Sequence, residues 1–386
     1  MAKDANDLLK EAGPSALRST IDQAPTMKDA TRNLEIGSDN EVAQRVADDI
    51  RAQIGELVHA EGNFFVWNDT HWAVLQDEMM VKFIQAYDGR EFKSPQGSTQ
   101  RYTLNKAKCD SVKELIRITL LERDFFRHSP IGVACTSGFI ALNDDGNATL
   151  EEHARNQRQR HIVNAEWIDE VWAGPQAGSL LETLTVGCFG NDEHALAHTQ
   201  LLGEILGAAV FGLGTKIVEP KATVLLGESA GNGKSQCLEM LRGLLPGHAT
   251  AAVAPIEMSK EQRRAQLAGV TLNAVDELGI DAIRSDTFKT IITGDRTSGK
   301  HVYKQPFEFY PIALHAFAAN DLPAFSEGLD RGIRRRVIVL PFERTIPRIE
   351  RIPHIGERAA REETDAILAM AVDGARRLLK NGGFPE

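Results

Sequence analysis

The spacing of apolar residues changes along the chain and marks four regions. Residues 1–40 are mostly polar and contain two prolines, which predicts a linker. In residues 41–190, helical spacing alternates with aromatic-rich runs such as FFVW, so we expect a smaller mixed α+β domain. In residues 191–345, short apolar runs alternate with helical segments, a pattern typical of a parallel α/β unit. Residues 346–386 predict a closing helical segment.

Local signals within the mixed domain predict a helix and two hairpins. Apolar residues from Val42 to Leu57 recur at helical spacing. The residues NDTH separate two aromatic-rich runs, and Asn143 to Gly146 supply turn residues between two alternating runs. No residue before about position 190 stands out as catalytic.

Residues 225–236, LLGESAGNGKSQ, lie between a short apolar run and a helical pattern. The usual phosphate-binding loop has four residues between its first glycine and Gly-Lys-Ser/Thr, whereas five separate Gly227 from Gly233. This departure leaves the role of Gly227 open. We expect the surplus residue to bulge the first half of the loop, near Ser229 to Gly231.

A strand before such glycines and a helix after them direct backbone N–H groups at an anion. In that context Lys234 is expected to reach the β- and γ-phosphates of ATP, and Ser235 to ligate Mg²⁺. The sequence therefore predicts an ATP and Mg²⁺ site. Its expected nucleotide-binding residues are Gly227, Gly231, Asn232, Gly233, Lys234, Ser235 and Gln236.

Polar residues end two further apolar runs. Asp276 and Glu277 follow GVTLNAV, where one carboxylate can hold the Mg²⁺ shell and another can orient the attacking water. Asn320 follows PIALHAFAA, where its amide can contact that water or the γ-phosphate. A solvated acidic turn and a turn-forming asparagine are the alternatives.

Four arginines precede the last apolar strand, VIVLPF. An arginine at the base of a strand can reach a neighbouring subunit's ATP site and stabilise transition-state charge, as arginine fingers do. All four cannot do so, and some are expected to pair with acids or to solvate an edge. They are Arg331, Arg334, Arg335 and Arg336.

The residues TGDRTSGKHVYKQPFEF predict a hairpin with Gly299 at its tip. Lys300, His301, Tyr303 and Lys304 follow, and charged and aromatic side chains on a protruding hairpin suit contact with a nucleic-acid backbone. The alternative is an ordinary solvated hairpin.

Composition narrows the class of protein. Hydrophobic residues make up 42% of the 386 residues, and we find no apolar run long enough to span a bilayer, so we expect no membrane partner and a cytoplasmic location. The net charge of -10 argues against a broad basic face on duplex DNA but permits a local one, such as a channel lining. Four widely spaced cysteines predict reduced, mostly buried thiols.

The order of these motifs resembles that of the superfamily 3 helicases, in particular the helicase part of phage and plasmid primase-helicases and their poxvirus-type relatives. GNGKS, the acidic strand end, SDTFKTIITGD, FAANDLP and the arginines before VIVLPF fall within about 110 residues. The resemblance covers residues 195–345 with specific motifs and residues 41–190 more loosely.

The resemblance implies an AAA+-like P-loop ATPase core in a homo-oligomeric ring, usually a hexamer. Such rings hydrolyse ATP between subunits and pull single-stranded or forked DNA through the centre with 3′ to 5′ polarity. By position it implies that Lys234 and Ser235 match the first motif, Asp276 and Glu277 the second, Asn320 the sensor, and Arg335 or Arg336 the finger, while Lys289, Lys300, His301 and Lys304 lie close to DNA.

We therefore expect an ATP-dependent DNA helicase that acts in the replication of a phage, prophage or plasmid in a bacterial host cell. Because the first 40 residues resemble the exit segment of a primase-side domain, we expect a primase domain in cis or in trans. A DNA-stimulated ATPase that loads or remodels without unwinding is the second hypothesis, and a structural ring protein without ATP turnover is the third.

Overall fold

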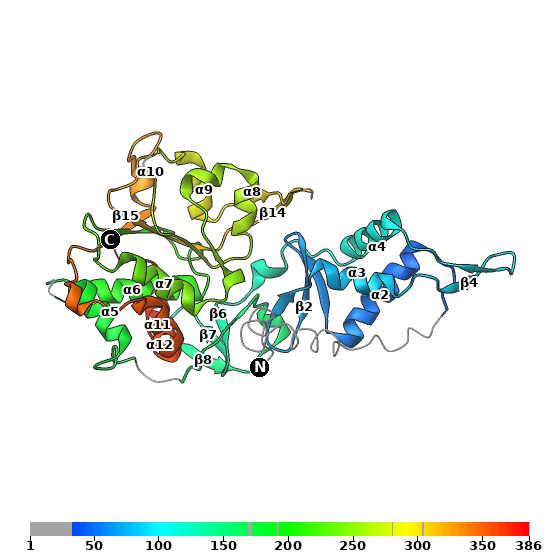
Figure 1. Cartoon of the computed structure of the whole chain (residues 1–386), viewed down its shortest axis with the longest axis horizontal. Coiled ribbons are helices and arrows are strands. Elements are labelled where there is room, and N and C mark those ends of the chain that lie inside the picture. The colour runs from blue at the N-terminus through cyan, green and yellow to red at the C-terminus, as the bar shows by residue number, and fades with distance from the viewer. Residues whose placement is uncertain (1–32, 169–171, 191–192, 280, 303–304, 386) are drawn as a thin grey trace. The chain divides into compact units, whose positions relative to one another are not determined.

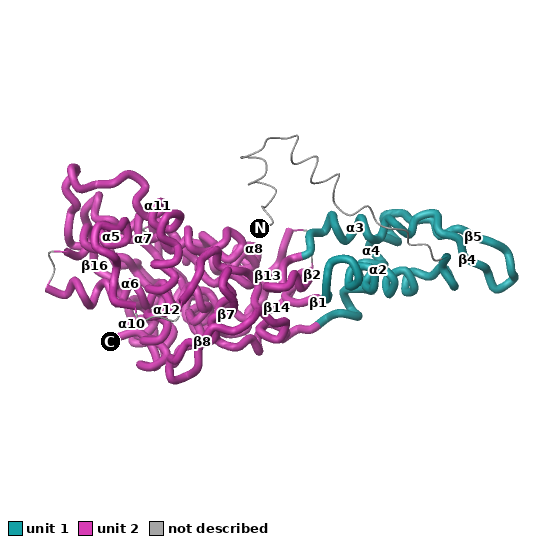
Figure 2. Tube along the Cα trace, turned by 90° about the horizontal axis from the view of Figure 1, so that it is seen from below, with its two compact units in different colours: residues 1–57, 75–121 teal, residues 58–74, 122–386 magenta. Residues whose placement is uncertain are grey.

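The structure, a computed structural model, describes residues 33–168, 172–190, 193–279, 281–302 and 305–385. These form two compact units (Figure 2). Unit 1 comprises residues 33–57 and 75–121, and unit 2 comprises residues 58–74 and 122–385. The domain boundary predicted at residue 190 falls inside unit 2, and most of the predicted linker lies outside the described residues.

Unit 1 consists of three helices that pack on one another and a two-stranded hairpin. The Ser38 hydroxyl accepts a hydrogen bond from the Glu41 N–H and begins the first helix. That helix ends at Gln53, and Leu57 opens a strand instead of continuing the predicted helix. Between them, Gly55 has a positive φ, a backbone conformation that other residues rarely adopt. The elements are α2 (Asp39–Gln53), α3 (Asp77–Gln85), β4 (Glu91–Lys93), β5 (Thr99–Arg101) and α4 (Lys106–Thr119).

A sheet of five parallel strands forms the centre of unit 2, in the order β11-β12-β15-β10-β16. All six residues of β15 are buried, as expected for a parallel strand covered on both faces. This confirms the predicted α/β class with a parallel sheet. The strands are β10 (Ala222–Leu226), β11 (Thr250–Ala251), β12 (Leu272–Val275), β15 (Leu314–Ala319) and β16 (Val337–Pro341).

Helices cover both faces of this sheet (Figure 1). Successive residues of β15 join different apolar clusters, since Ala316 packs with α6, α7 and α12 while Phe317 packs with α9. Gly374 allows α12 to approach α6 closely, because a Cβ there would lie 1.9 Å from the Gly203 carbonyl oxygen. The helices are α5 (Leu180–Phe189), α6 (Ala195–Val210), α7 (Lys234–Leu244), α8 (Glu261–Arg264), α9 (Ser285–Thr293), α10 (Arg331–Arg334), α11 (Ile355–Glu362) and α12 (Thr364–Asn381).

Smaller sheets complete unit 2. Their pairings include all three predicted hairpins, which are antiparallel, and a parallel pairing of β6 with β9. Gly299 does not form the tip of the third hairpin as predicted. It pairs with Phe307 and packs against Ala265, so the connection runs from Lys300 to Pro306. The strands are β1 (Leu57–Ala60), β2 (Asn63–Trp67), β3 (Trp72–Val74), β6 (Gly132–Cys135), β7 (Gly138–Leu142), β8 (Ala148–Glu151), β9 (Ile162–Val163), β13 (Thr297–Gly299) and β14 (Phe307–Phe309).

Short 3₁₀ turns connect several of these elements. They are η1 (Phe125–His128), η2 (Arg155–Gln157), η3 (Gly247–Ala249), η4 (Pro255–Ser259), η5 (Ala265–Leu267) and η6 (Arg348–Glu350). Among the described residues, no helix combines the length and the apolar character needed to cross a membrane.

Candidate nucleotide-binding site

The glycine loop joins strand β10 to helix α7, the context that the sequence predicts. Gly231 and Gly233 both have positive φ angles, and α7 begins at Lys234 directly after them. Within the described part of the chain, no backbone N–H from Glu228 to Gln236 donates a hydrogen bond. Backbone N–H groups are strong donors, and those at a helix N-terminus have no partner within the helix. A row of free donors at a helix N-terminus is the geometry of an anion-binding loop.

Lys234 points back over this loop. Its ammonium group donates to the Gly227 carbonyl oxygen and, over 3.3 Å, to Asn320 Oδ1. The residue is buried, and burial lowers the pKa of its side chain. A buried ammonium group beside free N–H donors favours an anionic ligand, because a nearby negative charge offsets the loss of hydration.

Close packing fixes the two ends of the loop. Asn232 is buried, and its amide donates to the Phe342 carbonyl oxygen over 3.3 Å. A Cβ on Gly227 would lie 2.4 Å from the Asn232 amide nitrogen, and one on Gly233 would lie 2.3 Å from Cys188 Sγ. Both positions therefore require glycine, and Gly227 has a packing role although its spacing departs from the usual pattern.

The first half of the loop lies against the segment that follows β16. Ile346 donates its N–H to the Gly231 carbonyl oxygen over 3.0 Å, and the Thr345 hydroxyl donates to Ser229 Oγ over 2.9 Å. The Arg351 guanidinium lies where a Gly231 Cβ would be. These contacts hold the part of the loop where the surplus residue was expected.

Ser235 and Gln236 open helix α7 but have different surroundings. Ser235 is exposed, which leaves its hydroxyl accessible to a metal ion. The Gln236 side chain accepts a hydrogen bond from the Gly356 N–H over 3.1 Å at the start of α11. Gln236 therefore joins α7 to α11, in addition to any contact with nucleotide.

Asp276 and Glu277 follow β12 at the same edge of the sheet as the loop. Both carboxylates are exposed, and Asp276 makes an ion pair with Arg242 of α7, with an Nη2–Oδ2 distance of 2.8 Å. Arg242 also donates to the Ala274 carbonyl oxygen over 3.0 Å and pairs with Glu239. The Arg242 guanidinium is thus paired with Asp276, the carboxylate that the sequence predicts to bind Mg²⁺.

Asn320 follows β15, the strand that separates β12 from β10. Leu226 pairs with Ala319 in the parallel register, which places Asn320 level with the start of the loop. Its side chain reaches Lys234 as described above. The structure therefore brings together Lys234 and Asn320, which are 86 residues apart in the sequence.

Arg335 and Arg336 lie at the opposite edge of the sheet. Val337 pairs with Ala222 at the start of β10, so the length of that strand, about 15 Å, separates them from the loop in the same chain. Arg336 donates to Thr293 Oγ1 over 3.1 Å and to the Gly332 carbonyl oxygen over 2.9 Å. Burial and the adjacent Arg335 lower the pKa of Arg336. Neither arginine can reach the loop of its own chain.

The expected DNA-proximal residues that the structure describes lie on different elements. Lys289 lies on α9 and pairs with Asp330 over 2.7 Å and with Glu327 over 3.6 Å. Lys300 and His301 lie in the hairpin connection, where the His301 ring stacks on Phe307. Lys304 lies outside the described residues.

The residues at this sheet edge suit a nucleotide and a divalent cation. The free N–H groups and Lys234 match the charge of phosphates, and Ser235 and Asp276 offer oxygen ligands of the kind that Mg²⁺ prefers. Two neighbours were not identified from the sequence. In the sequence, only the helical spacing around Arg242 marks its position, and no pattern marks Cys188 as a neighbour of the loop.

Comparisons with known proteins cover part of this region. The model of a family of unknown function (DUF5906) matches residues 225–336, from the end of β10 to the residue before β16. None of the curated proteins matches the chain. The chain is similar to a structure described as the A form apo NrS-1 C-terminal region, with 10% identity and a TM-score of 0.46 over 87% of this chain and 68% of that chain. A second structure, described as the A form apo NrS-1 C-terminal region (305-718), has 16% identity and a TM-score of 0.37, over 57% of this chain and 47% of that chain.

Proposed function

We propose that this chain is an ATP-dependent DNA helicase acting in phage or plasmid replication, as the motor part of a primase-helicase. The observation that carries the proposal is the glycine loop, where backbone N–H groups from Glu228 to Gln236, unpaired within the described residues, lie beside the buried ammonium of Lys234. A triphosphate supplies negative charge along that whole row of donors.

Each residue at the loop edge has a defined role in this proposal. Lys234 holds the β- and γ-phosphates, and Asn320 orients the Lys234 ammonium and contacts the γ-phosphate or the attacking water. Ser235 and Asp276 hold Mg²⁺, which neutralises charge that develops on the phosphates. Glu277, exposed beside them, orients the water and accepts its proton.

The arginines at the far edge support a ring. A side chain that lies a strand's length from its own loop can complete a site only in a neighbouring subunit. Arg336 is hydrogen-bonded within its own chain, whereas Arg335 is exposed and, among the described residues, donates no side-chain hydrogen bond. We therefore assign the finger to Arg335. A closed ring, with a hexamer as the expected size, gives every subunit such a neighbour.

The test compares ATP hydrolysis and unwinding of a 3′-tailed duplex by the purified chain. Lys234→Ala is expected to reduce both to background, while Lys106→Ala, at an exposed lysine of α4, leaves both unchanged. Unwinding that persists in Lys234→Ala would show that the loop does not drive the reaction.

A DNA-stimulated ATPase without unwinding is the second candidate. The pairing of Lys289 with Asp330 and Glu327 favours it, because it removes one of the cations expected to face DNA. ATP hydrolysis that rises with DNA but separates no strands supports this candidate. No ATP hydrolysis with Mg²⁺ leaves the third, a structural ring protein.

A further inference from the structure

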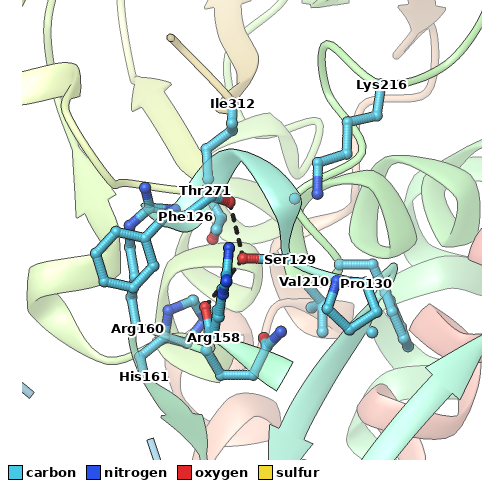
Figure 3. A pocket seen from close by; sticks show the side chains of 14 residues that line it. Phe126, Ser129, Pro130, Arg158, Arg160, His161, Val210, Lys216, Thr271 and Ile312 are labelled. Carbon is cyan, nitrogen blue, oxygen red and sulfur yellow. Dashed lines mark hydrogen bonds between the residues drawn. The ribbon is translucent and has the colours of Figure 1, made fainter. Parts of the chain in front are cut away.

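A basic pocket lies in unit 2 (Figure 3), at the edge of the sheet opposite the glycine loop. Thr271 and Ile312, which precede β12 and β15, form part of its wall. The pocket has a volume of about 40 Å³. Since one water needs about 10–15 Å³ by the same measure, the pocket has room for one small oxyanion group but not for a nucleoside.

Three cationic side chains line this pocket. Lys216 extends from one side, after helix α6, while Arg158 and Arg160 lie on the other side, before β9 (Figure 3). Lys216 is an exposed residue whose side chain lies at the rim of the pocket (Figure 3). Loss of hydration there, and to a smaller extent the charge of Arg160, lower the pKa of Lys216 to about 8.

Negative charge in the pocket does not balance these cations. Arg160 pairs with Glu61 over 2.6 Å. The Arg158 guanidinium donates to the Phe125 carbonyl oxygen over 2.7 Å, and among the described residues neither Arg158 nor Lys216 has a carboxylate partner. The pocket therefore carries an excess of positive charge in a chain whose net charge is -10.

Buried polar atoms without partners also line this pocket. His161 is 4% exposed, and within the described residues neither of its ring nitrogens makes a hydrogen bond. Arg160 Nε and Thr271 Oγ1 are likewise buried and unpartnered. Unpartnered buried polar atoms are rare in proteins and costly, so several around one pocket indicate a polar ligand.

We propose that this pocket binds a phosphate group, either free phosphate or a phosphate of a nucleic-acid backbone, between Lys216, Arg158 and His161. Burial lowers the pKa of His161 to about 3, so its neutral ring has one N–H to donate to the oxyanion. The site is separate from the glycine loop and does not depend on the proposed helicase activity.

The test uses the full chain carrying Lys234→Ala, which removes the main cation of the glycine loop as a competing phosphate site. Inorganic phosphate is titrated calorimetrically into this protein and into versions that also carry Lys216→Met, Lys216→Arg or Lys380→Met. We expect Lys216→Met to weaken phosphate binding about tenfold or more, because a charged hydrogen bond is lost. Lys216→Arg retains most of the affinity, and Lys380→Met, at an exposed lysine of α12, changes nothing.

A second arm measures how a labelled oligo-dT strand binds to the same proteins across salt concentrations. If the pocket takes a backbone phosphate, Lys216→Met lowers DNA affinity and reduces the slope of log affinity against log salt by about 0.7. If the pocket takes free phosphate, only the calorimetric titration responds. Equal behaviour of Lys216→Met and Lys380→Met in both arms would overturn the proposal.

Discussion

The contact between Gly233 and Cys188 gives a quantitative test of the loop geometry. Gly233 has a φ of +96°, and an alanine Cβ there would lie 2.3 Å from Cys188 Sγ. The left-handed backbone costs an L-residue about 1–2 kcal/mol. Overpacking in a well-packed region adds about 1–3 kcal/mol. We therefore expect Gly233→Ala to lower the free energy of unfolding by about 2–5 kcal/mol.

The two costs can be separated with a double-mutant cycle. Cys188→Ala removes the sulfur, whereas the Cys188 Cβ lies 3.8 Å from the new methyl group, an ordinary contact. The double variant should thus recover the steric share, an interaction free energy of about 1–3 kcal/mol, and should retain the backbone cost. Gly247→Ala is the matched control, because no atom of the described residues lies within 4 Å of a Cβ at that position.

Urea unfolding at 25 °C gives the four free energies, and ATP binding is measured on the same proteins. A Gly233→Ala loss no larger than that of Gly247→Ala would refute the assigned loop conformation. An interaction free energy below about 0.5 kcal/mol would show that Cys188 does not lie against Gly233.

Three further predictions concern the sheet edges. The Lys234→Ala and Arg335→Gln variants should each be inactive alone, but mixing them should restore ATP hydrolysis, because some subunit junctions then combine an intact loop with an intact finger. If the mixed rings stay inactive, the finger does not act in a neighbouring subunit. Arg242→Gln should lower the Mg²⁺ concentration for half-maximal hydrolysis by up to about fivefold, because it frees Asp276 from a surface ion pair that contributes at most about 1 kcal/mol. An unchanged Mg²⁺ dependence contradicts this. Sulfate, whose charge is constant above pH 4, should bind the pocket beside Lys216 equally at pH 6 and 7. Its affinity should fall above pH 8 to that of Lys216→Met, because Lys216 is charged below its pKa of about 8 and neutral above it. A flat calorimetric profile to pH 10 would exclude Lys216 as the anion ligand.

The elements around the site were predictable because their signals are local. The apolar run of β10, the glycines and the helical spacing of α7 are adjacent in the sequence, so periodicity alone places Lys234 at a strand-to-helix junction. The helix after Val42 was predicted too long, because apolar spacing continues into β1 while the backbone turns at Gly55. Gly299 was misplaced because its close contact is with Ala265 of the 3₁₀ turn η5, which is distant in the sequence.

The side chains that surround the site were not predictable, because they arrive from distant parts of the chain. Arg242 reaches Asp276 only once α7 packs against β12. Cys188 and Phe342 are 45 residues before and 109 residues after Gly233, and no local pattern marks either as part of a loop. The motif therefore locates the candidate site, while the packing that holds it depends on the fold.

The unusual spacing of the loop has a structural explanation in this packing. Lys234 and Asn232 both contact the region of Gly227, so the loop closes on its first glycine despite the extra residue. The added length lies where Ile346 donates to the Gly231 carbonyl oxygen, after β16. Because β16 begins directly after Arg336, the same strand links the loop at one edge of the sheet to the arginines at the other. A shift of the loop when nucleotide binds can therefore be transmitted along β16 to Arg335, which we propose contacts the ATP site of the neighbouring subunit.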